Sequence, residues 1–193
     1  MLRAALEAFT EQGYLATSVR DIHERAGVSL GTYYLYFRDK AEAMETLVAE
    51  AVIASADSVF PQLDLTTSDD TAADARGPRP VVAGFVRNYA ASADFFRVWE
   101  EATHVEPAVA RFRHDVSRVL DAAVRDAISA GQAAGTIRVD VDANVAARAL
   151  SAMVDRTCYL TFVVDDRRDS ITVDQTIDVL SDLWGHALGY GRG

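Results

Sequence analysis

The sequence contains little cysteine and proline and has no long uncharged stretch. Its single cysteine, Cys158, excludes an intrachain disulfide bond and any metal site built from cysteines alone, and it is typical of a reducing cytoplasm. With four prolines and a quarter of its residues charged, the chain has neither a collagen-like nor a disordered composition. No uncharged stretch approaches the roughly 18 to 20 apolar residues of a membrane-spanning helix, and no signal peptide is recognisable. We therefore expect a cytoplasmic protein without a membrane segment.

Basic residues are also scarce. Nineteen lysines and arginines stand against 29 aspartates and glutamates, which gives a net charge of −10 and a pI near 4.8. Lys40 is the only lysine, and the other 18 basic residues are arginines. Non-specific binding of nucleic acid needs a surplus of cations to neutralise phosphates. The overall charge, taken alone, therefore argues against a DNA-binding protein.

Helical periodicity runs through almost the whole sequence. The 193 residues, half of them apolar, are enough for one domain or for two small ones that share a core. Apolar residues recur three and four positions apart, and the alternation typical of strands is absent. The pattern predicts an all-α protein of about nine helices with a flexible loop near 61–80. The expected helices cover residues 2–12, 18–26, 29–37, 39–60, 81–103, a short segment from 107, 112–131, 142–163 and 172–188.

The second and third expected helices form a helix-turn-helix pattern. Ser18 is a suitable N-cap for the second helix, with Asp21 three positions later in place of the glutamate of a capping box. Gly27 suits the left-handed backbone of a tight turn, Val28 can pack between the two helices, and Ser29 can cap the third. In such a motif the second member lies in the major groove of DNA.

The third helix is uncharged and rich in aromatic residues. Residues 28–37 contain no charge, so nothing acidic would face a phosphate. Four aromatic side chains within five residues cannot share one helix face; we expect Tyr33 and Phe37 to point inward and Tyr34 and Tyr36 outward. An aromatic cluster of purely structural purpose is the alternative. Hydroxyl groups, and backbone that can approach DNA closely, are the usual neutral partners of phosphates and base edges. This composition therefore favours DNA binding.

At these residues the sequence resembles the DNA-binding domain of TetR-family transcriptional regulators. The resemblance covers about the first 48 residues and is carried by Ala4–Phe9, Gly13–Ile22 and Gly27–Lys40. It implies a DNA-binding domain in residues 1–46 and a helical regulatory domain in residues 47–193 that binds a ligand and dimerises. The C-terminal part, through Ala149–Thr157 and Leu183-Trp184, bears a faint resemblance to a mycobacterial repressor of the same family.

The resemblance also implies which residues touch DNA. Lys40 corresponds to a lysine that binds a phosphate beside a helix N-terminus, itself an anion site. Leu30 departs from the family because many relatives have lysine or another polar residue there, which predicts weaker polar readout or contact with a thymine methyl group. The implied DNA contacts are Val19, Arg20, Ser29, Leu30, Gly31, Thr32, Tyr34, Tyr36 and Lys40.

Two interpretations remain open for the C-terminal aromatic residues, which either fill a helical core or line an apolar cavity for a small molecule. The resemblance implies the second, with candidate ligand contacts at Phe85, Tyr89, Phe96, Trp99, Phe112, Met153 and Tyr159. A monomer reaches only one DNA half-site, so a partner surface is needed. The last two long helices are candidates for a two-fold four-helix interface, as in the family, formed by Val145, Ala149, Val173, Ile177, Leu180 and Trp184.

Signals for catalysis or metal binding are lacking. The sequence has no glycine-rich phosphate loop and no nucleophile elbow, and its histidines, His23, His104, His114 and His186, lack zinc-ligand spacing. We predict no enzyme, no metal and no cofactor. The favoured hypothesis is a homodimeric repressor that a small, largely apolar effector releases from a palindromic operator. The alternative is a helical protein that binds a small molecule and keeps a vestigial DNA-binding domain.

Overall fold

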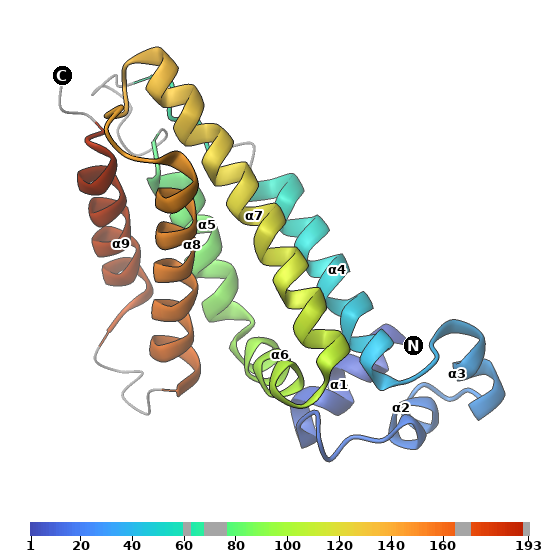
Figure 1. Ribbon diagram of the computed structural model, residues 1–193. Coiled ribbons are helices and arrows are strands. Elements are labelled where there is room, and N and C mark those ends of the chain that lie inside the picture. The colour runs from blue at the N-terminus through green and yellow to red at the C-terminus, as the bar shows by residue number, and fades with distance from the viewer. Residues whose placement is uncertain (60–62, 68–76, 165–170, 191–193) are drawn as a thin grey trace. The chain divides into compact units, whose positions relative to one another are not determined.

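The computed structural model describes residues 1–59, 63–67, 77–164 and 171–190. The secondary structure of these residues is helical without a β-strand, which confirms the predicted all-α fold (Figure 1). Within these ranges the elements are α1 (Leu2–Gln12), α2 (Val19–Arg25), α3 (Leu30–Tyr36), α4 (Lys40–Val59), α5 (Arg79–Ala91), α6 (Ala93–Val105), α7 (Pro107–Ala134), α8 (Ala143–Tyr159), the π-helical segment η3 (Leu160–Val164) and α9 (Val173–Leu188).

Two of the expected helix boundaries are wrong. The single helix predicted over residues 81–103 is divided into α5 and α6, because Ser92 leaves the helical conformation with φ −119° and ψ 26°. Conversely, the short helix expected from Pro107 and the longer one expected from Phe112 are one helix, α7. Proline at the first helical position starts a helix without interrupting it, and the apolar repeat continues through the buried Val109 and Val116.

The chain divides into two compact units. The first consists of Met1–Ala54 and Ser92–Val116. In it α1 packs against α2 and α6, and α2 packs against α3. Phe9, Ile22 and Tyr33 are completely buried in this unit. The rings of Phe9 and Tyr14 lie 5.3 Å apart between centroids. These contacts hold three short helices that would not be stable alone.

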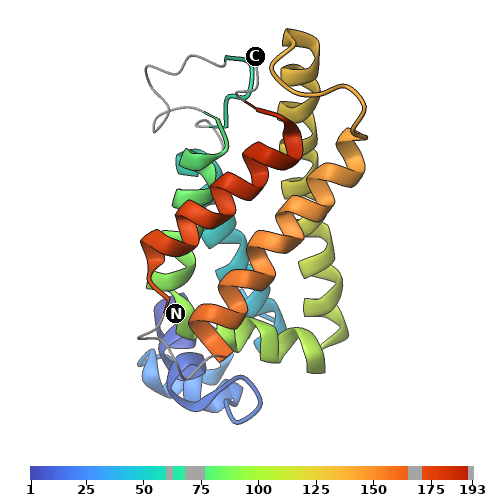
Figure 2. The ribbon, with the colours of Figure 1, turned by 90° about the vertical axis from the view of Figure 1, so that its left-hand side faces the viewer.

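The second unit consists of Ser55–Ala91 and Ser117–Gly193. Here α5 packs against α9 and α8, and the three helices run side by side in both views (Figures 1 and 2). Val86, Ile128 and Leu188 are fully buried. Capping is strong at α9, where the Thr172 hydroxyl accepts from the Gln175 amide at 3.1 Å and the Gln175 side chain accepts from the Thr172 amide at 2.9 Å.

Burial corrects half of the predicted dimer interface. Ile177, Leu180 and Trp184 are 1 to 3% exposed because they face the core of the second unit, so they have almost no surface left for a partner. Val145 and Ala149 on α8 are exposed, and Val173 at the start of α9 is half-buried. The side of α9 that faces solvent instead carries Val179 and Leu183.

Part of the predicted flexible loop near 61–80 is packed; residues 61–62 and 68–76 lie outside the described residues. Leu65 is buried, and its carbonyl accepts a hydrogen bond from the Thr136 hydroxyl. This approach requires glycine at Gly131 in α7, because a Cβ atom there would lie 2.8 Å from the Leu65 carbonyl oxygen and 2.5 Å from Cγ1 of Ile137. Residues 63–67 are therefore anchored to the second unit.

We expect Gly131→Ala to lower the free energy of unfolding by about 1 to 3 kcal/mol, because the new methyl group would overlap a backbone carbonyl that cannot easily move. Urea denaturation measures this change. The matched control is Gly185→Ala in α9, where a Cβ atom would meet nothing within 4 Å. That substitution should stabilise the helix by up to about 1 kcal/mol. Equal effects of the two substitutions would contradict the proposed packing.

Candidate nucleic-acid interface

The start of α2 is fixed by a capping box. The Ser18 hydroxyl accepts from the Asp21 amide at 3.3 Å, and the Asp21 carboxylate accepts from the Ser18 amide at 2.8 Å. Hydrogen bonds from the Ser18 hydroxyl and amide hold the pKa of Asp21 below its usual value. The predicted roles of both residues are confirmed. A four-residue signal in the sequence thus sets where the first helix of the motif begins.

The turn between α2 and α3 has the predicted geometry. Gly27 has φ +68°, and a Cβ atom there would have no neighbour within 4 Å, so the left-handed backbone alone favours glycine. The Val28 amide donates to the His23 carbonyl at 3.1 Å. The Ser29 hydroxyl accepts from the Thr32 amide at 3.1 Å and so caps α3, as predicted. Local hydrogen bonds therefore fix the entry of the chain into α3.

The aromatic residues of α3 point as predicted. Tyr33 and Phe37 are buried, whereas Tyr34 and Tyr36 are 54% and 67% exposed. The Tyr33 hydroxyl donates to the Asp39 carbonyl at 2.9 Å, and burial raises the pKa of this phenol. Leu35, which is not among the predicted DNA contacts, also points outward. It is 84% exposed, and a helical projection would have found it because it lies four residues after Gly31.

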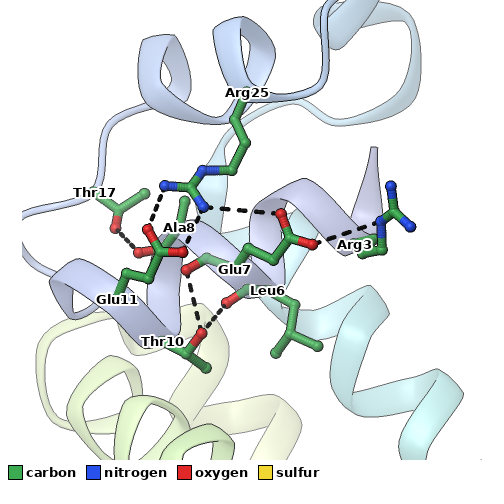
Figure 3. A network of polar contacts seen from close by, with 8 residues as sticks. All are labelled: Arg3, Leu6, Glu7, Ala8, Thr10, Glu11, Thr17 and Arg25. Atoms are coloured by element: carbon green, nitrogen blue, oxygen red, sulfur yellow. Dashed lines mark hydrogen bonds and ion pairs between the residues drawn. The ribbon is translucent and has the colours of Figure 1, made fainter.

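The arginines around the motif are paired with carboxylates. Figure 3 shows the Arg25 guanidinium reaching Glu11 and Glu7 on α1, the first with an Nη1 to Oε1 distance of 2.8 Å. This guanidinium holds the pKa of Glu11 below its usual value. Three more pairs join residues four positions apart along one helix or helix start: Arg3 to Glu7 at 3.6 Å, Arg20 to Glu24 at 2.7 Å and Arg38 to Glu42 at 3.0 Å.

These exposed pairs reduce the positive potential around the motif. Their guanidinium groups can still exchange a carboxylate for a phosphate. Surface ion pairs contribute little to stability because water screens them. The Arg20 side chain is 79% exposed, so its guanidinium can exchange Glu24 for a phosphate. The predicted contact of Arg20 with DNA remains a prediction that its exposure permits.

Lys40 has a structural role that no local sequence signal marks. Its ammonium donates to the carbonyls of Tyr14 at 2.8 Å, Thr17 at 2.9 Å and Leu15 at 3.4 Å. It also lies over the Tyr14 ring, 4.4 Å from the centroid. An ammonium has three donors, so a phosphate would have to displace one of these carbonyls. The phosphate contact stays a prediction beside this observed role.

Glu101 of α6 binds the backbone amides of the turn between α1 and α2. Its carboxylate accepts from the amide of Tyr14 at 2.9 Å and from that of Leu15 at 3.0 Å. Gly13 has φ +85°, and a Cβ atom there would lie 3.1 Å from Oε2 of Glu101. The segment 14–17 between α1 and α2 is thus held by an anion on its amides and by a cation on its carbonyls. No local sequence signal marks Glu101, which is more than 80 positions away.

The candidate ligand residues are divided between the two units. Phe85 and Tyr89 of α5 are 5.8 Å apart between ring centroids in the second unit. Phe96 and Trp99 of α6 are 6.0 Å apart in the first. The remaining three are half-buried: Phe112 on α7 and Met153 and Tyr159 on α8. The choice between core and ligand contact therefore stays open for each of them.

Neither metal ligands nor a membrane span are found in the part of the chain that the structure describes. There, no three histidine, cysteine, aspartate or glutamate side chains come together as metal ligands would. No described helix combines the length and apolar character needed to cross a bilayer. Cys158 is buried in α8, and burial raises the pKa of its thiol to about 12.

Comparison with known proteins agrees with this arrangement. Residues 1–47 match the family of bacterial regulatory proteins called the tetR family. A 53-residue segment is 40% identical to an uncharacterized HTH-type transcriptional regulator, YvdT, of Bacillus subtilis; it spans 28% of this chain and 27% of that relative.

Two solved structures show that the fold similarity extends over almost the whole chain. The fatty acid degradation regulator FadR from Bacillus halodurans has a TM-score of 0.75 at 19% identity, with 95% of this chain and 91% of that chain covered. A transcriptional regulator from Rhodococcus sp. Rha1 has a TM-score of 0.71 at 17% identity, with 98% and 95% covered.

The helix-turn-helix of residues 18–37 lies inside the segment that matches the family. The relatives named above are described as regulators. The N-terminal helix-turn-helix segment is thus similar in sequence to the tetR family of bacterial regulatory proteins.

Proposed function

We propose that the protein is a homodimeric, ligand-responsive repressor that binds a palindromic DNA operator through α3. The observation that carries this proposal is an exposed, uncharged face on a helix whose start, end and inward side are fixed by specific contacts. Such a face suits the major groove, where a helix presents side chains to base edges. The reducing cytoplasm, where the operator would be found, is compatible with the single buried thiol.

The exposure of the predicted DNA contacts supports this assignment. Around the first turn of α3, Ser29, Leu30 and Gly31 are exposed, and the half-buried Thr32 follows them. Val19, at the start of α2, is half-buried, and Arg20 beside it is exposed. The predicted contact Lys40 differs from these residues, because its ammonium already binds backbone carbonyls.

For the dimer we propose the solvent side of α8 and α9. Val145 is 69% exposed and Ala149, one turn later, is exposed as well. On α9, Val179 and Leu183 lie four residues apart and are 58% and 48% exposed. Neighbouring exposed apolar residues on two helices that touch are typical of a protein interface. A second copy would cover this surface and supply the second half-site contact, roughly 34 to 36 Å along the DNA.

For the effector we propose a small, largely apolar molecule. Support comes from the fold similarity to a regulator of fatty acid degradation and from the half-buried aromatic residues of α5, α6 and α7. Binding would favour a conformation in which the two recognition helices no longer match the operator, so the difference in affinity between the two conformations would drive release. A small-molecule binder with a vestigial DNA-binding domain remains the second candidate.

Specific DNA binding tests the proposal directly. Selection from a random DNA pool should enrich a palindromic sequence, and a gel shift at fixed salt with competitor DNA should show specific binding. Tyr34→Ala should weaken this binding by about tenfold or more, because the phenol would lose a hydrogen bond worth about 0.5 to 1.5 kcal/mol and its ring would lose apolar contact in the groove. The control Ile53→Ala removes an exposed apolar side chain from α4 and should bind like the wild type. Failure of any sequence to be enriched would favour the vestigial domain.

Lys40→Ala should lower the free energy of unfolding by about 1 to 3 kcal/mol, because the carbonyls of residues 14, 15 and 17 lose a charged donor. Operator affinity should fall with it. Arg38→Ala is the control, since it removes an exposed cation two residues away and should leave the free energy of unfolding close to that of the wild type. Weaker DNA binding at unchanged stability would instead assign Lys40 to a phosphate alone.

Leu183→Glu should convert the dimer into a monomer, because a buried unpaired carboxylate is costly at an apolar interface. Sedimentation velocity measures the change, and operator affinity should fall in parallel. Val139→Glu is the matched control: Val139 is 79% exposed in the connection between α7 and α8. Persistence of the dimer in Leu183→Glu would exclude this face of α9.

A further inference from the structure

The exposed face of α3 is apolar, although α3 is the part of the chain proposed to read DNA. Leu35 is 84% exposed and Leu30 is 45% exposed. Single exposed leucines are common on protein surfaces. Here, however, the two leucines and the ring of Tyr34 belong to a helix of seven residues whose inward side is filled by Tyr33. Neither leucine is needed for the core of the first unit.

Gly31 sits on this face and has no structural requirement for glycine. A Cβ atom there would meet only the Ser29 hydroxyl oxygen, at 3.7 Å, and the backbone does not have positive φ. Glycine inside a helix costs roughly 0.5 to 1 kcal/mol relative to alanine. Packing and backbone conformation do not account for this cost. A partner that approaches the backbone closely between the leucines does account for it.

Hydrogen-bonding groups on the face are few. From residue 28 to residue 37 the chain has no arginine, lysine, asparagine or glutamine, which form bidentate pairs with bases, and no aspartate or glutamate, which accept from cytosine. The hydroxyls of Ser29 and Thr32 lie 2.8 Å apart and bond to each other. The phenols of Tyr34 and Tyr36 remain. The face can therefore discriminate among bases mainly through apolar contact.

We infer that this protein recognises its operator through the 5-methyl groups of thymines, contacted by Leu30, Leu35 and the ring of Tyr34. The thymine methyl is the apolar group that base edges present in the major groove. The inference rests on the proposed function, since it assumes that α3 enters that groove. It predicts thymines at defined positions of each half-site, facing the leucines.

Replacement of single thymines by deoxyuridine tests the inference on the operator obtained by selection. Deoxyuridine keeps the base pair and every hydrogen-bonding group and removes only the methyl. Burial of one such group contributes about 0.8 kcal/mol, so affinity should fall about fourfold for one half-site and by about the square of that factor for both. Equal affinity for the thymine and deoxyuridine operators at every position would overturn the inference while leaving the proposed function intact.

Variants of the protein assign the methyl contact to side chains. Leu35→Ala or Leu30→Ala should abolish the preference for thymine over deoxyuridine at one position each, and both positions are exposed enough to tolerate alanine. The control Ile53→Ala should keep the preference. If Leu35→Ala instead changes the oligomeric state and keeps the preference, the face binds protein and the inference fails. Absence of specific binding to any DNA would reject the proposed function itself.

Discussion

The turn between α1 and α2 depends on two opposite charges that approach it from different helices. Its amides at Tyr14 and Leu15 donate to the Glu101 carboxylate, and its carbonyls accept from the Lys40 ammonium. A turn outside regular secondary structure must find partners for both kinds of backbone group. An ammonium can direct three donors to three separate carbonyls, whereas a planar guanidinium suits a carboxylate. This difference explains why the only lysine of the chain stands at this position while the arginines pair with acidic side chains.

Features fixed within one helical turn could be predicted from the sequence. The caps at Ser18 and Ser29, the left-handed Gly27 and the inward direction of Tyr33 all depend on residues a few positions apart. The carboxylate of Glu101 could not be predicted because its partners lie 86 and 87 positions away. The side of α9 that faces solvent, which we propose for the dimer, could not be predicted either. Because α9 carries apolar residues on both sides, its periodicity did not show that Trp184 is inside and Leu183 outside.

The acidic composition and the proposed readout are physically consistent. Each phosphate neutralised by a cation steepens the salt dependence of DNA binding by about 0.9 in the logarithmic slope. Here the arginines at positions 3, 20, 25 and 38 contact carboxylates, so each phosphate contact requires exchange of a partner. Non-specific binding should then be weak, and specific binding depends on the few groups that fit the groove. A face read through methyl groups meets this condition, because its contribution is insensitive to salt.

The start of α4 connects the turn between α1 and α2 to the exposed face of α3. Two adjacent residues contact two different elements. The Lys40 ammonium binds the α1–α2 turn, and the Asp39 carbonyl accepts from the Tyr33 hydroxyl on the inward side of α3. The Asp39 carboxylate also accepts from the Glu42 amide at 2.9 Å and so caps α4. Successive residues of a helix are about 100° apart, so an anchored Tyr33 leaves Gly31 and Leu35 on the opposite side. The rotation of α3, and with it the choice of side chains that α3 exposes, is thereby set by the residues that hold the rest of the motif together.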